Sequence, residues 1–404
     1  MIISYQLLLY LLLPVFIGFS IKHVLSNKNS LFLWQRFGLK TTTLINPTWF
    51  HCASVGEVMT AIPLIKLYHQ KFPDKDILLT TNTITGANLC RKQLSFVTHN
   101  FLPLDYRFIT RLFLKKIKPE KLIILETEIW PNLFQLCKKQ GIGISIINGR
   151  LSERSLDINS WSKRIYKQSL SYVDKILCRS FADAEGYQFL GANKNKIEVT
   201  GNLKFATPLD IKDTENLINR EYVLIASTHA GEEKALAELW QQSEHDELLL
   251  VIAPRHPERK DEIINDIKSS AGEIKVRSKD QAISTATDIY LADTLGELPA
   301  LFQHAKFVIM GGSFVKKGGH NILEPAAFSK AILYGPSMEN FAAEDILFKE
   351  HKAAIQADNN QQAVEKINRL ISDSDYRTSL GSNARNLMLK YNDIAESYLN
   401  KIKD

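Results

Sequence analysis

The chain has 404 residues, of which 45% are hydrophobic and 23% charged, so a largely disordered protein is excluded and two domains of ordinary size are expected. The formal net charge of +6 conceals an asymmetry: residues 22–200 carry 26 Lys and Arg against 13 Asp and Glu, whereas the chain after residue 200 carries 24 against 31. The basic first half predicts an anionic partner, such as a membrane surface, a phosphorylated lipid or a nucleic acid.

The first 21 residues contain no charged side chain. As a helix they would be ~31 Å long, just enough to cross the hydrocarbon core of a bilayer. A cleaved signal peptide is disfavoured, because the basic start and the small-residue cleavage site are both missing. Because Lys and Arg residues follow between positions 22 and 40, we predict that residues 1–21 form a membrane-anchor helix and that the rest stays cytoplasmic. Pro14 and the marginal length leave both a spanning and a half-inserted anchor open.

From residue 48 onward, apolar runs typical of strands alternate with stretches typical of helices. The strands expected in the first half are 48–52, 77–81, 122–125, 142–147, 175–178 and 197–200. The helices expected between them include 59–71, 107–116, 131–139 and 160–170. Such alternation is typical of a parallel sheet that is covered by helices on both faces.

The same alternation restarts in the second half of the chain. The strands expected there are 222–226, 248–253, 273–276, 289–291, 307–310 and 331–333. A polar segment, 206–220, is expected to be the linker, which gives an N-terminal domain over 22–205 and a C-terminal domain over 206–404. Two doubly wound units in series predict a cleft between them, with ligands at the carboxyl ends of the strands.

Four cysteines limit the possible metal and redox chemistry. Cys52, Cys90, Cys137 and Cys178 lie far apart and form no paired motif, which argues against a zinc site and against a disulfide framework. Because three of them stand in or beside apolar runs, we predict buried free thiols in a reducing compartment. The acid pairs Asp74/Asp76 and Asp373/Asp375 match a metal-binding spacing but are interpreted as surface turns, and no other cluster has metal-ligand spacing, so we predict no metal site.

Glu57 is the first candidate for chemistry. It lies at the end of the stretch His51-Cys52-Ala53-Ser54-Val55-Gly56-Glu57, which closes the first expected strand and begins a helix. One interpretation is an N-terminal acid that stabilises its helix through the dipole, which would lower the pKa of Glu57. The other is a general base for an acceptor hydroxyl, with its pKa raised by burial. The residues alone leave both interpretations open.

Polar loops also follow other expected strands. Glu126 and Glu128 come directly after one strand, and their spacing places them on opposite sides of an extended chain, so they need not share a role. Further polar loops occupy 148–155, 200–205 and 253–259. Each loop alone is typical of a solvated surface, but several at strand ends in one chain favour a ligand site.

A glycine-rich stretch follows the expected strand 307–310 in the second half. Its four glycines allow sharp turns and close approach to a ligand, and the segment 321–327 after it has the features of a helix start. Strand, glycine loop and helix N-terminus together are typical of a phosphate site with free backbone N–H groups. The polar side chains in the stretch favour such a site over an ordinary turn: Lys316, Lys317, His320, Asn321 and Glu324.

Taken in order, these motifs closely resemble those of the 3-deoxy-D-manno-octulosonic acid (Kdo) transferases, over nearly the whole chain. The motifs are 51–57, 126–133, 148–155, 201–205, 254–259, 293–298, 311–325 and 335–341. The resemblance implies a GT-B fold, with two Rossmann-like doubly wound domains that face a cleft, and an anchor in the bacterial inner membrane. It also implies an inverting transfer of Kdo from CMP-Kdo to the lipid A precursor lipid IVA in lipopolysaccharide biosynthesis. No metal, no other cofactor and no nucleic-acid partner are expected.

The resemblance also implies roles for individual residues. Glu57 corresponds to the general base, and Glu126 and Lys204 correspond to residues that stabilise the transition state. The expected CMP contacts are Pro254, Arg255, Leu295, Gly296, Glu297, Asn321, Ile322, Leu323 and Glu324. These roles fit the residues, because Arg255 can neutralise a phosphate leaving group without a metal and the basic first half suits a phosphorylated lipid.

Two other functions remain open from the sequence. A sugar-nucleotide epimerase or another GT-B transferase is disfavoured by the apolar N-terminal segment and by the Glu57 loop. An inactive nucleotide-binding scaffold at the membrane is disfavoured by the joint presence of Glu57, Glu126 and Lys204. No motif indicates how many Kdo residues are transferred.

Overall fold

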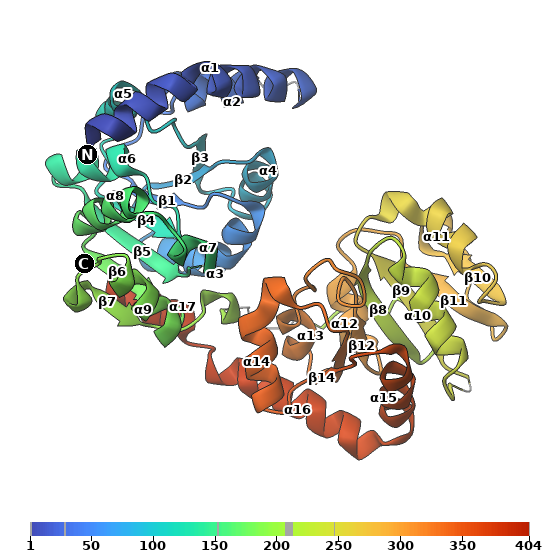
Figure 1. Ribbon diagram of the computed structural model, residues 1–404. Helices are drawn as coiled ribbons and strands as arrows, with labels where there is room; N and C mark the ends of the chain where they lie inside the picture. Colours follow the sequence, from blue (N-terminus) through green and yellow to red (C-terminus); the bar gives the residue numbers. More distant parts are fainter. Residues whose placement is uncertain (1, 28–29, 152, 207–212, 246, 404) are drawn as a thin grey trace. The chain divides into compact units, whose positions relative to one another are not determined.

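The computed structural model describes residues 2–27, 30–151, 153–206, 213–245 and 247–403. The chain forms two compact units, Met1–Ala206 together with Asp393–Asp404, and Thr207–Asn392. Each unit contains one seven-stranded sheet whose paired strands are parallel (Figure 1). The two parallel-sheet α/β domains predicted from the sequence are therefore confirmed.

The sheet of the first unit has the strand order β3-β2-β1-β4-β5-β6-β7. Its strands are β1 (Thr48–His51), β2 (Ile77–Thr81), β3 (Thr98–Phe101), β4 (Lys121–Leu125), β5 (Gly143–Gly149), β6 (Lys175–Cys178) and β7 (Ile197–Val199). Its helices are α1 (Ile2–Asn27), α2 (Ser30–Arg36), α3 (Val55–Lys71), α4 (Ile84–Gln93), α5 (Arg107–Ile117), α6 (Pro131–Lys139), α7 (Glu153–Leu156), α8 (Ser160–Ser171), α9 (Phe181–Phe189) and α17 (Ile394–Ile402), with 3-10 turns at Lys194–Lys196 and Leu203–Phe205. The strand order reverses between β1 and β4, which is where doubly wound sheets bind ligands.

The second unit repeats this topology, with the order β10-β11-β9-β8-β12-β13-β14. Its strands are β8 (Tyr222–Thr228), β9 (Leu249–Pro254), β10 (Glu273–Val276), β11 (Thr287–Leu291), β12 (Val308–Met310), β13 (Ile332–Tyr334) and β14 (Ile355–Gln356). Its helices are α10 (Glu232–Gln241), α11 (Lys260–Ile267), α12 (Leu298–His304), α13 (Leu323–Ala327), α14 (Ala342–Glu350), α15 (Asn360–Ser372) and α16 (Ser374–Lys390), with 3-10 turns at Pro257–Arg259, Arg277–Lys279 and Glu339–Phe341. Here the order reverses between β8 and β12.

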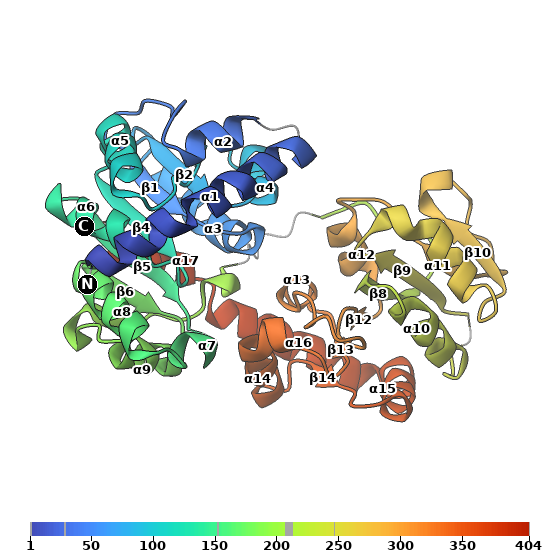
Figure 2. The same cartoon turned by 45° about the horizontal axis from the view of Figure 1, so that its top comes forward.

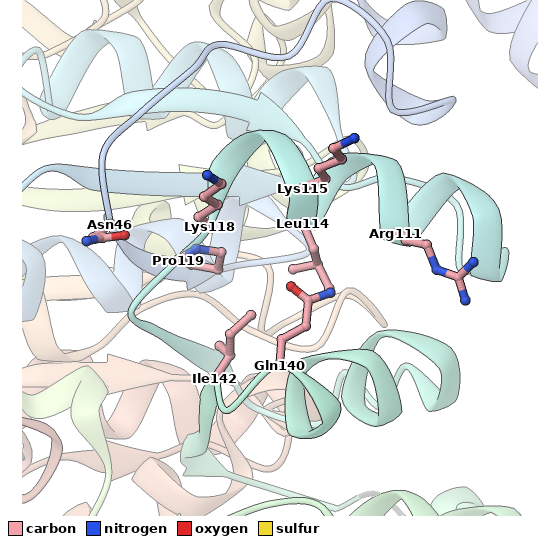
Figure 3. A pocket seen from close by; sticks show the side chains of 8 residues that line it. All are labelled: Asn46, Arg111, Leu114, Lys115, Lys118, Pro119, Gln140 and Ile142. Atoms are coloured by element: carbon pink, nitrogen blue, oxygen red, sulfur yellow. The ribbon is translucent and has the colours of Figure 1, made fainter.

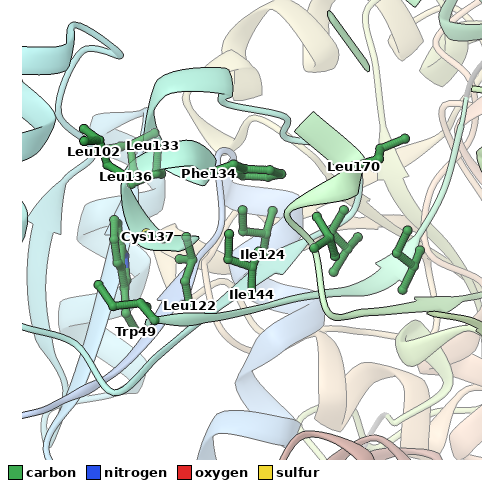
Figure 4. Packing of buried hydrophobic residues seen from close by; sticks show 14 of the residues in the cluster. Trp49, Leu102, Leu122, Ile124, Leu133, Phe134, Leu136, Cys137, Ile144 and Leu170 are labelled. Carbon is green, nitrogen blue, oxygen red and sulfur yellow. The ribbon is translucent and has the colours of Figure 1, made fainter. Parts of the chain in front are cut away.

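Apolar side chains from the sheet and its covering helices form the core of each unit. In the first unit, side chains of β1, β4 and β5 face those of α6 (Figure 4). Those that the figure labels are Trp49, Leu122, Ile124, Ile144, Leu133, Phe134, Leu136 and Cys137. All four cysteines of the chain are buried and free, as the sequence predicted.

The last helix differs from the domain assignment made from the sequence. Residues 393–404 belong to the first unit, although the second domain was expected to extend to residue 404. Helix α17 packs against α3 (Figure 1), and the Tyr398 hydroxyl donates a hydrogen bond to the carbonyl of Gly201 at 2.6 Å. Part of the expected linker differs as well: residues 207–212 lie outside the described residues, but Thr214 Oγ1 binds Gln303 Oε1 at 2.7 Å, so 213–220 is part of the second unit.

Helix α1 runs lengthwise along one side of the first unit (Figures 1 and 2). Leu9 packs against Tyr106 and Ile109 at the start of α5, and the Tyr5 hydroxyl donates to Asp105 Oδ2 at 2.9 Å. The helix expected over 1–21 is therefore present and longer. Of the helices in the described part of the chain, none is both long enough and apolar enough to cross a membrane.

Candidate functional site

The carboxyl ends of β1 and β4 bring two of the predicted carboxylates to one edge of the first sheet. The two strands are neighbours, with His51 opposite Ile124, so the loops that follow them leave the sheet side by side. Glu57 lies in the loop-to-helix turn after β1, and Glu126 follows β4 directly. This edge is therefore the candidate site of the first unit.

Glu57 occupies the first turn of α3, where its carboxylate accepts two hydrogen bonds. The Ala53 backbone N–H donates to Oε2 at 2.8 Å and the Ser54 hydroxyl donates to Oε1 at 3.0 Å. Ser54 is the N-cap residue of α3, and its hydroxyl oxygen also accepts from the Glu57 backbone N–H. Glu57 therefore lies in the first turn, where an acid interacts favourably with the helix dipole. The same bonds fix the orientation of the carboxylate, which a general base also requires.

The pKa of Glu57 separates this residue from an ordinary helix cap. Burial raises its pKa to about 7, and the neighbouring carboxylates of Glu126 and Glu128 also raise it. The hydrogen bonds from Ala53 and Ser54 act in the opposite direction and do not cancel the effect of burial. A carboxylate with a pKa near the operating pH is suited to accept a proton from a hydroxyl.

Glu126 adopts an uncommon backbone conformation. Its φ of 59° lies in the left-handed region, which non-glycine residues seldom occupy. Contacts on both sides hold it there: its N–H donates to Ile147 O at 2.9 Å, and its carbonyl accepts from the Tyr187 hydroxyl at 2.9 Å. The Arg150 guanidinium lies 3.7 Å from its carboxylate. Strained residues that the surroundings hold in place are common at functional sites.

Sequence reasoning missed the contribution of His51 and Arg36 to this edge. His51 is fully buried; its Nδ1 lies 2.9 Å from Thr80 Oγ1, and its Nε2 lies 3.9 Å from Glu128 Oε2. The Arg36 guanidinium donates to Asn82 Oδ1 at 3.1 Å, and burial lowers its pKa to about 10 while Glu128 opposes that shift. Arg36 comes from α2, so no local pattern could have placed it near Glu128.

Lys204 lies on the 3-10 turn Leu203–Phe205, beyond the carboxyl end of β7. This turn packs against α3, the helix that begins with Glu57. Two asparagine side chains hold its backbone: Asn148 Oδ1 accepts from Leu203 N at 2.9 Å, and Asn202 Oδ1 accepts from Lys204 N at 3.1 Å. The three residues expected to be catalytic therefore all follow strands at the carboxyl edge of the first sheet.

In the second unit, the glycine loop after β12 does not offer the free amides that the sequence predicted. The carboxylate of Glu232, which is fully buried, accepts from Gly312 N at 2.7 Å, from Phe314 N at 3.0 Å and from His229 N at 3.2 Å. The amide of Gly318 donates to Ser337 Oγ at 3.0 Å. An internal carboxylate thus takes the place of a bound phosphate at the amides of His229, Gly312 and Phe314.

Some of the expected CMP contacts lie together and others are buried. Arg255 follows β9 and is exposed, and its charge lowers the pKa of Glu324, whereas burial, the larger cause, raises it. Asn321 Nδ2 donates to Glu324 Oε1 at 3.0 Å. Ile322 and Leu323 are buried in the core, so their side chains cannot contact a ligand. Pro254 is also buried, as the last residue of β9.

The loop Leu295-Gly296-Glu297 precedes α12, which contacts α13. Leu295 is 83% exposed, and Gly296 has a φ of 92°, a conformation that favours glycine. The carboxylate of Glu297 is already engaged within the protein, because the Arg277 guanidinium donates to both its oxygens, at 3.0 and 3.3 Å. Arg277 is the main cause that lowers the pKa of Glu297.

Three histidines that sequence reasoning did not assign lie beside the glycine loop. His229 follows β8, His256 follows β9, and His320 ends the loop. His229 Nε2 lies 2.9 Å from His320 Nε2, and the His229 and His256 ring centroids are 5.8 Å apart. The position of His229, directly after the first strand of the second unit, parallels the stretch 51–57 of the first unit and could have drawn attention to it. In the described residues, no group of three or more His, Cys, Asp or Glu side chains could hold a metal ion.

Comparison with known families assigns both halves of the chain. A family described as 3-deoxy-D-manno-octulosonic-acid transferase (kdotransferase) matches residues 32–207, and a family described as glycosyl transferases group 1 matches residues 233–387. The 3-deoxy-D-manno-octulosonic acid transferase of Rickettsia felis is 34% identical over 80% of this chain and 71% of that protein. The Haemophilus influenzae enzyme of the same name is 29% identical over 92% of this chain and 90% of that protein.

Solved structures share the fold at low sequence identity. A glycosyltransferase from Rickettsia africae is 15% identical, with a TM-score of 0.60, and covers 89% of this chain and 98% of its own. The UDP-GlcNAc 2-epimerase of Neisseria meningitidis is 12% identical, with a TM-score of 0.59, over 89% of this chain and 100% of its own. At this identity both likenesses concern the fold alone.

The account of Glu57 predicts how its carboxyl group titrates. We expect a pKa near 7 in the folded protein, which ¹³C NMR of glutamate-labelled protein measures, with Glu57→Gln to assign the signal. Glu126→Gln removes a neighbouring negative charge and should lower that pKa. Glu120→Gln is the matched control: Glu120 pairs with Lys75 and precedes β4, at the opposite end of that strand from Glu126, so this change should leave the titration of Glu57 in place. A Glu57 pKa at the ordinary value of about 4.3 would contradict the account.

Proposed function

Because the chain belongs to the 3-deoxy-D-manno-octulosonic acid (Kdo) transferase family of glycosyltransferases, we propose that it transfers Kdo from CMP-Kdo to the lipid A precursor lipid IVA. The observation that carries the proposal is Glu57, an oriented carboxylate with a pKa raised to about 7 at the carboxyl edge of the first sheet. In this proposal the acceptor binds to the first unit and the donor to the second.

Glu57 acts as the general base. Its carboxylate takes the proton from the attacking hydroxyl of the acceptor, while the hydroxyl oxygen forms the new bond to the anomeric carbon of Kdo. The bond from that carbon to the phosphate oxygen breaks, and CMP leaves with the electron pair. Attack from the side opposite to CMP inverts the anomeric carbon. Ala53 and Ser54 keep the carboxylate oriented. Glu126 stabilises the positive charge that develops on the sugar in the transition state, and Lys204 stabilises the negative charge that develops in the same state.

The leaving phosphate is stabilised by protein cations in this proposal, without a metal. Arg255 and Lys317 supply the charges, since both lie close enough to His229 to lower its pKa, although burial is the largest cause of that shift. Glu324, held by Asn321, is placed to accept hydrogen bonds from the ribose hydroxyls. Arg255 also lies near Glu324. The phosphate of CMP would bind to Arg255, and its ribose would bind to Glu324.

We further propose that the enzyme works at the cytoplasmic face of the inner membrane, with α1 lying in the interface. The exposed face of α1 is apolar: Leu7, Leu8, Tyr10, Leu11 and Val15 are 40–77% exposed. The opposite face is fixed to the protein through Tyr5 and Leu9. An exposed apolar face of this kind suits a helix that lies in the plane of the headgroups.

A basic pocket on α5, beside α1, supports the same location. Arg111, Lys115 and Lys118 line a pocket of about 570 Å³ together with Asn46, Leu114, Pro119, Gln140 and Ile142 (Figure 3). The lining includes no acidic side chain, so the headgroup of an anionic phospholipid would find three cations there. The exposed Phe108 lies at the start of the same helix.

A transfer assay tests the proposed reaction. Full-length protein incubated with CMP-Kdo and lipid IVA should release CMP and give a product heavier by one or more Kdo residues in mass spectrometry. Arg255→Ala removes a charge-assisted contact worth about 1.5–3 kcal/mol, so the KM for CMP-Kdo should rise about tenfold to a hundredfold. The matched control is Arg369→Ala, which removes an arginine whose side chain is 58% exposed. This variant should leave the KM for CMP-Kdo unchanged. Absence of product with the unmodified protein would contradict the proposal.

Vesicle binding tests the proposed location. Replacing Arg111, Lys115 and Lys118 together by Gln removes three cations, each worth about 1 kcal/mol near an anionic surface. Binding of the full-length protein to vesicles that contain phosphatidylglycerol should weaken about a hundredfold, as measured by co-sedimentation. The matched control replaces Lys349, Lys352 and Lys366, which line a pocket of the second unit, and should bind as the unmodified protein does. Equal binding of both triple variants would refute the role of α5.

A further inference from the structure

The side chains of His229 and His320 are joined directly to each other beside the glycine loop. Their Nε2 atoms are 2.9 Å apart, their ring planes differ by 8°, and the ring centroids are 5.0 Å apart. Nearly parallel planes with this centroid separation and so short a nitrogen distance place the two rings edge to edge. The contact is therefore an N–H···N hydrogen bond in the plane of both rings.

This geometry limits the number of protons that the pair can hold. In the neutral pair, one ring donates its Nε2–H, and the other accepts at Nε2 and carries its own hydrogen on Nδ1. One further proton converts the donor ring into an imidazolium, and the hydrogen bond remains. A second proton would place two hydrogens between the same nitrogens. The pair can therefore gain one positive charge without losing its structure.

The groups around the pair keep it neutral when no ligand is present. Burial is the largest cause that lowers the pKa of His320, to about 4, and the pKa of His229 is also lowered. The nearby basic groups come from the end of β9 and from the glycine loop: Arg255, His256 and Lys317. The nearby acids are already engaged: Glu232 with backbone amides, Glu233 with Thr228 and Arg259, and Glu324 with Asn321. The pair thus has hydrogen-bonding capacity for a charge, but burial and the nearby basic groups, which outweigh Glu233 at His229, disfavour that charge.

The glycine loop is shaped to hold the two rings. A side-chain carbon at Gly312, where φ is 68°, would lie 2.7 Å from His320 Cδ2 and 3.4 Å from His229 Cδ2. Glycine at this position therefore lets both imidazoles lie against the backbone. Since Glu232 occupies the amides of Gly312 and Phe314, an anion at this part of the loop would meet side chains, among them the two rings.

We propose that the His229–His320 pair takes up one proton from solvent when the phosphate of CMP or CMP-Kdo binds, and that the resulting imidazolium helps to hold that phosphate. The inference rests on the proposed function, because it takes the second unit as the donor site. The phosphate of CMP-Kdo is a diester with one negative charge, and the CMP that leaves is a monoester with two. The charged pair therefore fits the phosphate best as the bond to Kdo breaks.

Proton uptake fixes the direction of the pH dependence. Because the complex holds one proton more than the free protein and ligand, CMP affinity rises as the pH falls. The change approaches tenfold per pH unit between the pKa of the free pair and the higher pKa of the occupied pair. CMP itself has a phosphate pKa of about 6, so the dependence is read between about pH 6.5 and 8.

Calorimetry on the full-length protein tests this inference. CMP is titrated at pH 7 in two buffers that differ in ionisation enthalpy, and the difference in binding heat gives the number of protons taken up. We expect uptake approaching one proton for the unmodified protein. His229→Gln and His320→Gln keep a side-chain amide near the position of Nε2 but cannot titrate, so uptake should disappear and binding at pH 7 should weaken about tenfold. His256→Gln replaces the neighbouring histidine outside the pair and should retain the uptake.

Each outcome decides the question. CMP binding by the unmodified protein without proton uptake would overturn the inference and leave the proposed donor site standing, whatever the variants do. Uptake that persists in both His229→Gln and His320→Gln would assign the proton to another group and overturn it as well. Failure of the unmodified protein to bind CMP would overturn the donor site and the inference together.

Discussion

The hydrogen bonds from Ala53 and Ser54 to the Glu57 carboxylate are the contact on which the proposed chemistry depends. They fix the carboxylate at the carboxyl edge of a parallel sheet, where burial and the neighbouring acids raise its pKa to about 7. The sheet topology brings those acids there, because β4 lies beside β1 and its loop begins with Glu126. The hydrogen bonds thus orient the carboxylate, while burial, against the effect of those bonds, raises its pKa to about 7, which suits the proposed general base.

The second unit uses a glutamate at the equivalent place for a different purpose. Glu232 also begins the helix after the first strand of its unit, but its side chain is fully buried and three backbone amides donate to it. Because its carboxylate oxygens already accept these hydrogen bonds, Glu232 holds the glycine loop in place and is not available as a base. Glu57 lies nearer the surface and shares its edge with other acids. In the proposed function, the first unit therefore supplies the base and the second binds the anion, although their topologies are similar.

The sequence predicted what local patterns determine. Apolar runs located the buried strands of both sheets and several helices of the first unit, but β3 and β14 were missed, because three of the four residues of β3 are polar and β14 has only two residues. The expectation of free amides in the glycine loop was wrong at Gly312, because a distant contact decides it: Glu232 lies 80 residues before Gly312 in the chain yet occupies its amide. Ile322 and Leu323 belong to the motif 321–324 that was expected to contact CMP, but their apolar side chains are buried in the core. The His229–His320 contact joins residues 91 positions apart, which no spacing rule reveals.

The rate of Kdo transfer by Glu57→Gln tests the central claim most directly. Gln keeps the shape of the side chain and an oxygen that can accept from Ala53 N, so the protein should fold and bind CMP with unchanged affinity. Without a carboxylate to take the hydroxyl proton, the rate of transfer at saturating CMP-Kdo and lipid IVA should fall at least ~10²-fold, the scale of general-base catalysis. A variant that transfers Kdo at close to the unmodified rate would show that Glu57 only stabilises its helix, and the account of the site would be wrong.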